Sequence, residues 1–223
     1  MLSLFIAFVG IASSLIIGEL LWHAKILRGE YARKFIHITS ATYIAFWPLF
    51  LSQIEIVLIS LSFIVILVIT KKLGLFKSLR SIKRVSYGEI WYALGIGVCA
   101  LLFTDSAVFA VAVLTMALAD GMAAVVGVSF KNKAGVFMVH GHKKSFAGTL
   151  TFIIVSFIIN YIYFSKYGFD TLPAILAMPV FYAMISFANA TILSVAEIFS
   201  PKGSDNIIVP VLAGMLVLAP TVL

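Results

Sequence analysis

Charged residues and cysteine are both scarce in this chain of 223 residues. Charged side chains make up 11% of it, against about 25% in an ordinary soluble domain, whereas 62% of its residues are hydrophobic. Together with the mean hydropathy of +1.14, this excludes a water-soluble fold. The single cysteine, Cys99, lies in an apolar run, which excludes an internal disulfide and a cysteine-based zinc site but leaves the redox compartment open.

Lysine and arginine are absent before the first apolar run, which covers residues 2–22. A cleavable signal peptide begins with a basic segment and has a shorter apolar stretch. We therefore expect this run to remain as the first membrane helix, with no transit peptide before it.

Long apolar runs fill most of the chain, and crossing a bilayer takes about 20 mainly apolar residues. They predict an all-α bundle of about eight transmembrane helices, at 2–22, 35–51, 54–70, 89–104, 106–129, 146–164, 172–190 and 207–223. The fourth and eighth runs are short, so seven or nine spans remain open. No internal repeat or low-complexity segment divides the sequence, and residues 1–223 are expected to form a single membrane domain.

The basic residues are distributed unevenly between these runs. The loops after the first, third, fifth and seventh spans hold 15 of the 16, namely Lys25, Arg28, Arg33, Lys34, Lys71, Lys72, Lys77, Arg80, Lys83, Arg84, Lys131, Lys133, Lys143, Lys144 and Lys202. Because cytoplasmic loops are rich in Lys and Arg, this pattern places these loops in the cytoplasm and both termini outside. It explains the net charge of +7 without a nucleic-acid partner, and it places any active site on the cytoplasmic face.

Asp120 lies within an apolar span, in the stretch ALADGMAAVVG at 117–127. A carboxylate at membrane depth costs several kcal/mol unless it faces a polar interior, which makes Asp120 a candidate site residue. Small residues share its helix face, so another backbone or a phosphate could approach closely there. The alternative is a tight helix-packing face with the aspartate neutralised by a neighbouring Lys or Arg.

The stretch HGHKKSFAGT at 140–149 sets Lys143 and Lys144 just before a helix whose expected N-cap is Ser145. Free N–H groups at a helix start bind phosphate, and lysines add charge beside them. The glycine spacing does not fit the Walker-type phosphate loop. Alternatively, both lysines only anchor the helix at the membrane surface.

Weaker polar signals lie near the other cytoplasmic loops. Arg33 and Lys34 lead into the second span with His37 on the same side, which is also what residues at a lipid interface would show. Glu89 follows a turn and is favoured near a helix start. Glu197 belongs to a turn-rich loop before the last span, where Asp205 or Asn206 would be the N-cap.

Carboxylates and cations from all the cytoplasmic loops are thus expected at one membrane face. Carboxylate oxygens hold Mg²⁺, and Mg²⁺ with Arg or Lys binds the phosphates of a nucleotide. This combination of residues is typical of phosphoryl transfer. The candidate metal ligands are Asp120, Glu89, Glu197 and Asp205.

Taken in order, these motifs resemble the polyprenol kinase family, which includes dolichol kinase, phytol kinase and the CTP-dependent diacylglycerol kinase of yeast. The matching pieces are Arg33-Lys34 with His37, SYGE at 86–89, ADGMAA at 119–124 with Gly127, KSFAGT at 144–149, and Glu197 followed by Pro201, Gly203, Asp205 and Asn206. They run from the second span to the last. Large dolichol kinases carry many more spans ahead of this region, and this chain lacks them.

The resemblance implies an integral membrane kinase that moves the γ-phosphoryl group of CTP, with a divalent metal, onto the hydroxyl of an isoprenoid alcohol or diacylglycerol. It assigns Arg33, Lys34, Asp120 and Gly127 to the nucleotide-using region. We expect Asp120, Lys144, Arg33 and Lys34 to be catalytic, and nucleotide contacts from a second set: Lys143, Ser145, Gly121, Gly127, Gly148 and Asn206. A prokaryotic cell membrane is the expected location.

Two other functions remain open at this stage. A phosphatidate cytidylyltransferase also uses CTP, but there the lipid phosphate attacks the α-phosphorus of CTP and pyrophosphate is released. A transporter would use Asp120 as a proton or ion site, with the basic loops setting topology alone. The acceptor lipid, the donor nucleotide and the oligomeric state are not determined by the sequence.

Overall fold

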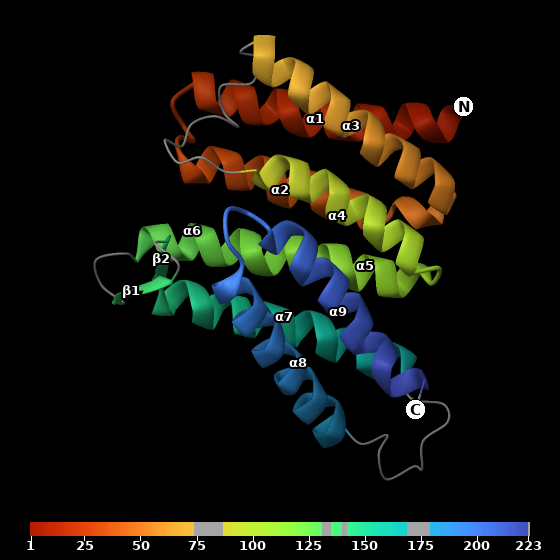
Figure 1. Ribbon diagram of the computed structural model, residues 1–223, viewed down its shortest axis with the longest axis vertical. Coiled ribbons are helices and arrows are strands. Elements are labelled where there is room, and N and C mark those ends of the chain that lie inside the picture. Colours follow the sequence, from red (N-terminus) through yellow and green to blue (C-terminus); the bar gives the residue numbers. More distant parts are fainter. Residues whose placement is uncertain (74–86, 131–134, 140–141, 169–178, 223) are drawn as a thin grey trace.

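The computed structural model describes residues 1–73, 87–130, 135–139, 142–168 and 179–222, which are almost entirely helical (Figure 1). The helices are α1 (Leu2–His23), α2 (Glu30–Ile44), α3 (Gln53–Leu73), α4 (Gly88–Leu102), α5 (Ser106–Leu114), α6 (Gly121–Ser129), α7 (Phe146–Tyr167), α8 (Pro179–Phe199) and α9 (Asp205–Val222). A short 3-10 helix, η1 (Trp47–Leu49), follows α2, and a π-helical segment, η2 (Thr115–Asp120), joins α5 to α6. The predicted all-α class is confirmed.

A small antiparallel hairpin was not predicted. Its strands are β1 (Val136–Val139) and β2 (His142–Ser145), and Lys143 and Lys144 lie on β2 opposite Met138 and Phe137. Both chain termini lie at the end of the molecule opposite this hairpin (Figure 1). The basic segments 77–84 and 131–133 and the dipeptide 140–141 lie outside the described residues.

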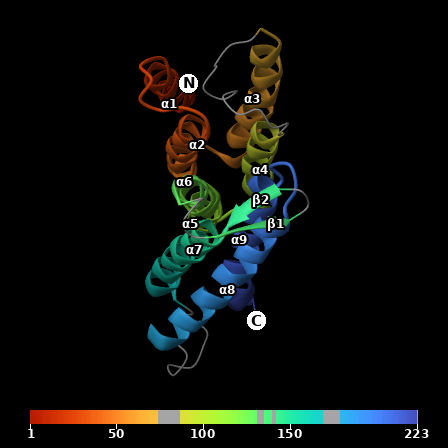
Figure 2. The ribbon, with the colours of Figure 1, turned by 90° about the vertical axis from the view of Figure 1, so that its left-hand side faces the viewer.

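The helices form two layers, which Figure 2 shows edge-on. In one layer α1 packs on α2, α2 packs on η2 and α6, and α6 packs on α7. In the other, α3 packs on α4, α4 on α9, and α9 on α8. Contacts of α7 with α8 and of α5 with α9 join the layers. The rod formed by α5, η2 and α6 is therefore central. In an apolar 18-residue stretch of the rod 67% of the residues are buried, against 22% in the corresponding stretch of α1.

Among the described residues, five helical segments are long and apolar enough to cross a membrane: α1, the Gln53–Thr70 part of α3, the rod Ser106–Ser129, α7 and α8. Helix α4 and the Asp205–Ala219 part of α9 are apolar but shorter. Large side chains such as Phe5, Leu20 and Leu58 are exposed on the outer helices, as expected where lipid is the solvent. The chain is a multi-pass membrane protein, and the count of eight spans stays a prediction.

Two predicted spans have the wrong bounds. The run predicted at 35–51 corresponds to α2, which begins at Glu30 and ends at Ile44. The helix begins earlier than predicted because an ion pair between Glu30 and Arg33 neutralises its first turn. It ends earlier because a 3-10 helix containing Pro48 follows it. The run predicted at 172–190 corresponds to α8 at 179–199, and residues 172–178 lie outside the described part of the chain. Proline suits the first turn of a helix, and α8 begins at Pro179.

Candidate functional site

Helix α2 carries three polar side chains into the protein interior. Arg33, Lys34 and His37 are all buried, at 9%, 3% and 8% exposure. Arg33 is held within its own helix, because its Nε donates to Glu30 at 3.3 Å and a second guanidinium nitrogen pairs with the same carboxylate. These residues therefore belong to the helix, whereas the sequence placed the two cations before it.

Asp120 is the last residue of the π-helical segment. Its carboxylate lies close to two side chains of α2, the ammonium of Lys34 and the imidazole of His37. The Lys34 ammonium donates a hydrogen bond to Asp120 Oδ2, and His37 Nε2 lies 3.6 Å from the same oxygen. His37 Nε2 also lies 3.2 Å from the Met116 carbonyl oxygen. The buried carboxylate is thus neutralised by Lys34, and a π-helical turn is a feature often found at functional sites.

A second ion pair links the hairpin to α8. Lys144 lies at the end of β2, and its ammonium donates to the Glu197 carboxylate and, at 3.2 Å, to the Glu197 backbone carbonyl. Glu197 lies in the last turn of α8 and is buried, so its predicted position in a loop is wrong. Lys143, which precedes Lys144 in the strand, is exposed on the opposite face of the hairpin.

The two ion pairs meet in an acidic cluster. One carboxylate oxygen from each of Asp120, Glu197 and Asp205 lies within 4.8 Å of the others, and the first two residues are buried while Asp205 is half-buried. Three carboxylates this close repel one another unless cations compensate them, and Lys34 and Lys144 supply two positive charges. Hard oxygen donors from three elements suit Mg²⁺, so this set fits the predicted divalent ion.

Glu89 does not belong to the acidic cluster. It lies in the first turn of α4, as expected, on the wall of a cavity, and α4 contacts α9 through Asn206. The Asn206 side-chain amide donates to the Gly88 carbonyl at 2.8 Å. Helix α9 begins at Asp205, so Asp205 and Asn206 lie in its first turn and neither is the N-cap that the sequence predicted.

The glycines predicted to contact nucleotide lie in helix–helix contacts, and their contact with nucleotide stays a prediction. A Cβ on Gly121 would collide with Ile38 of α2, and Gly127 packs against Gly148, where a Cβ would lie 2.8 Å from the Ala123 carbonyl oxygen. These contacts explain the small residues through close packing, which was the alternative to a phosphate site.

Ser145 is the predicted N-cap of α7. Its hydroxyl accepts a hydrogen bond from the Gly148 N–H at 3.1 Å, which confirms that role. The side chain is buried in the contact between α6 and α7, and this cap explains its presence without a nucleotide.

The sequence assigned no site role to His37, although it belongs to the motif that resembles the polyprenol kinases, and it did not point to Tyr92. Their rings lie 5.1 Å apart, and His37 reaches Asp120. The available signal for His37 was its place one turn after Arg33 and Lys34, which a histidine at a lipid interface would share. Tyr92, in an apolar run of α4, gave no signal.

Comparison with known proteins decides between the functions that the sequence left open. The chain is 32% identical over 202 residues to a protein named phytol kinase from Synechocystis sp., and the alignment covers 86% of this chain and 80% of that relative. The chain belongs to the polyprenol kinase family. It is accordingly a phosphotransferase with an alcohol as acceptor. No protein-family profile and no solved structure matches the chain.

Proposed function

We propose that the protein is an integral membrane kinase that transfers the γ-phosphoryl group of CTP to the hydroxyl of an isoprenoid alcohol such as phytol. The observation that carries the proposal is the convergence of Lys34, Asp120, Lys144, Glu197 and Asp205 from five separate segments of a polyprenol kinase family member. Phosphoryl transfer depends mainly on positioning and charge neutralisation, and these residues supply both.

The acidic cluster would hold Mg²⁺ through Asp120, Glu197 and Asp205. An ion held by these carboxylates would supply positive charge against the charge that develops on the phosphates during transfer. A triphosphate drawn to this cluster comes within reach of the two lysines already paired with it. Lys34 and Lys144 then exchange a carboxylate for phosphate oxygens, so that no ammonium is left buried and unpaired.

The transfer itself requires that the alcohol oxygen attack the γ-phosphorus as the bond to the leaving nucleoside diphosphate breaks. The proton of the alcohol must go to a nearby base. Asp120, whose carboxylate is buried beside His37, either takes this proton or holds the ion together with Glu197 and Asp205. Arg33 lies one residue from Lys34 on the wall beside this carboxylate, and its fixed guanidinium adds positive charge where the nucleotide arrives.

The proposed orientation places this site on the cytoplasmic face of a prokaryotic cell membrane. The supporting observation is the distribution of Lys and Arg in the sequence, together with the two termini at the end away from the hairpin (Figure 1). Water-soluble nucleotide then reaches the acidic cluster from one side while the alcohol arrives from the bilayer.

The test uses purified protein with Mg²⁺, phytol and CTP labelled in its γ-phosphate. Label in the lipid supports the kinase, label in pyrophosphate indicates a cytidylyltransferase, and no turnover indicates a protein of another kind. Competition with unlabelled ATP, GTP and UTP measures the donor preference. The control is Glu55→Gln, which removes an exposed carboxylate in the first turn of α3, outside the acidic cluster, and should leave transfer unchanged.

A further inference from the structure

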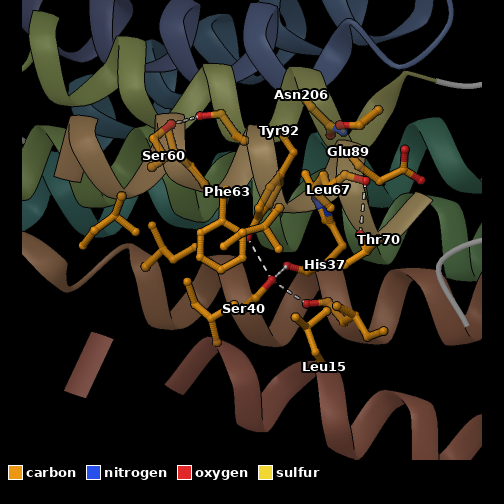
Figure 3. Close-up of a pocket in the computed structure, with 18 of the residues that line it drawn as sticks. Leu15, His37, Ser40, Ser60, Phe63, Leu67, Thr70, Glu89, Tyr92 and Asn206 are labelled. Carbon is orange, nitrogen blue, oxygen red and sulfur yellow. Dashed lines mark hydrogen bonds between the residues drawn. The ribbon is translucent and has the colours of Figure 1, made fainter. Parts of the chain in front are cut away.

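A cavity lies between the two helix layers, walled by α1 and α2 on one side and by α3 and α4 on the other (Figure 3). The space between the atoms of its walls is about 900 Å³, which includes the part open to the outside, and the walls are predominantly apolar. Along α2 it extends from Arg33 and His37 to Ile44 and, beyond it, Trp47. Seven residues separate His37 from Ile44, which is about 10 Å of helix, so the cavity is elongated parallel to the helices.

The hydroxyl groups on the cavity wall are already satisfied within the protein. Ser40 donates to the Ile36 carbonyl at 2.6 Å, and the Tyr92 hydroxyl lies 2.8 Å from Ser40 Oγ (Figure 3). Ser60 donates to a backbone carbonyl of α4, and Thr70 donates to one in its own helix at 3.1 Å. Hydroxyl groups that are already hydrogen-bonded within the protein need no hydrogen bond from a ligand, so this part of the wall acts as an apolar surface.

Asn206 differs from these groups. Its side chain is 3% exposed and lines the cavity, and Oδ1 has no hydrogen-bond partner among the described residues. The orientation of the amide is fixed, because the Gly88 carbonyl can only accept and therefore faces the amide nitrogen. A buried acceptor without a partner costs about 1–3 kcal/mol, which a ligand hydroxyl would recover by donating to it.

Trp47 Nε1 is a second unpartnered atom on the wall, but it lies at the other end of α2, edge-on to the Tyr43 ring. An indole N–H only donates. The unpartnered acceptor of Asn206 therefore lies at the end of the cavity that adjoins the acidic cluster, where Glu89 also lines the wall. Asn206 follows Asp205 in α9, and His37 both lines the cavity and lies 3.6 Å from Asp120 Oδ2.

We propose that this cavity holds the hydrocarbon tail of the acceptor alcohol, a single-chain isoprenoid, with its hydroxyl donating to Asn206 Oδ1 beside Asp120. The inference rests on the proposed kinase function and deepens it by placing the acceptor. An elongated apolar chamber with one polar end matches an amphiphile with one tail and one hydroxyl. A diacylglycerol, which has two tails, is the alternative occupant.

Photo-crosslinking tests the placement without any phosphoryl transfer. Full-length protein in lipid nanodiscs is irradiated with a farnesol analogue that carries a diazirine in its tail, without nucleotide, and the adducts are mapped by mass spectrometry. Adducts are expected on Phe63 and Leu67, which face the cavity from α3. Adducts confined to Leu58 and Val65 of the same helix, which are 57% and 59% exposed, would overturn the inference.

Failure of the kinase proposal gives a different result, namely adducts in the cavity with no label transferred from CTP. A competition arm separates the lipid classes. An excess of phytol should abolish the cavity adducts, whereas an excess of diacylglycerol should not, and stronger protection by diacylglycerol would overturn the assignment of a single-chain alcohol.

Two size variants test the same chamber through turnover. Ala93 lines the cavity, and Ala93→Leu should lower kcat/KM for phytol about tenfold more than for the shorter geraniol, a typical effect of extra bulk in an apolar pocket. Phe63→Ala widens the chamber and should shift preference toward longer prenols. Ala12→Leu, which makes the same change at an exposed position of α1, should do neither. Equal loss with both alcohols in Ala93→Leu would contradict the placement.

Asn206 is tested by separating binding from turnover. Asn206→Ala should lower kcat about tenfold while the cavity adducts persist, because the apolar tail supplies most of the binding and the hydroxyl is no longer oriented. Unchanged kcat would remove Asn206 from the acceptor site.

Discussion

The pairing of Lys34 with Asp120 has two explanations, and they predict opposite results in one experiment. Either Lys34 only makes a structural carboxylate tolerable inside the membrane, or the carboxylate takes part in transfer. Three variants decide between them: Asp120→Asn, Lys34→Met and the double variant. Methionine is unbranched and apolar, so it fills the space of the lysine side chain without its charge.

The side chains of Lys34 and Asp120 are 3% and 7% exposed, so neither charge is screened by water. Removing one partner of such a pair leaves a buried, uncompensated charge and typically costs about 3–5 kcal/mol of stability. The double variant removes both charges and should recover most of that loss. Activity should not recover, because the loss of one transition-state carboxylate is expected to reduce transfer about 100-fold, or about 2.7 kcal/mol.

The assay measures thermal unfolding in detergent and γ-phosphoryl transfer on the same preparations. We expect both single variants to unfold at lower temperature, the double variant to unfold near the wild-type temperature, and all three to be nearly inactive. Glu55→Gln should match the wild type in transfer, because its carboxylate lies outside the acidic cluster. A stable double variant with activity within a few-fold of the wild type would refute the reasoning, because Asp120 would then be needed only as a partner for Lys34.

Three further predictions concern other contacts. In steady-state kinetics, Lys144→Ala should raise the KM for nucleotide about tenfold by removing a phosphate-binding charge. The control Lys166→Ala, at the end of α7 away from the hairpin, should leave the kinetics unchanged. An equal effect of the two variants would refute the assignment of Lys144. Gly148→Ala should destabilise the protein by about 1–3 kcal/mol, seen as a lower unfolding temperature, because its Cβ would lie 2.8 Å from a carbonyl oxygen. Asn189→Leu should cost about 1 kcal/mol by breaking its 3.1 Å bond to Asn160, with kcat unchanged, and a loss of kcat would instead connect this contact to catalysis.

Hydropathy located most of the helices because a long apolar run has few other stable arrangements in a bilayer. The errors fall where charge enters a helix. Arg33 and Lys34 were read as the end of a loop, whereas Glu30 and Asp120 neutralise them inside the protein. Glu197 was read as a loop residue for the same reason, and Lys144 neutralises it within α8. A hydropathy pattern scores each charged residue by itself and contains no information on the ion-pair partner that lies far away in the sequence.

The site was predicted as a set of residues at one face but not as a set of contacts. Lys34 and Asp120 are 86 positions apart, and only the packing of α2 on η2 and α6 brings them together. The same packing gives two of the glycines a structural role. Gly121 meets Ile38 of α2 and Gly127 meets Gly148 of α7, and the sequence could not distinguish such helix contacts from a close approach of phosphate. His37 was overlooked because its role depends on that contact.

The π-helical segment determines the direction in which the buried Asp120 side chain points. In a regular helix each residue is rotated by about 100° about the helix axis relative to the one before it. A π-helical turn contains one extra residue, so the side chains after it point in a different direction from those of an uninterrupted α-helix. Asp120 stands at the end of that widened turn, facing Lys34 and His37 on α2 rather than lipid. The central rod therefore remains apolar enough to cross the membrane while it delivers one carboxylate to a polar interior. Since the same face of α2 also borders the cavity, the rotation sets Asp120 beside the place where the hydroxyl of an alcohol would emerge.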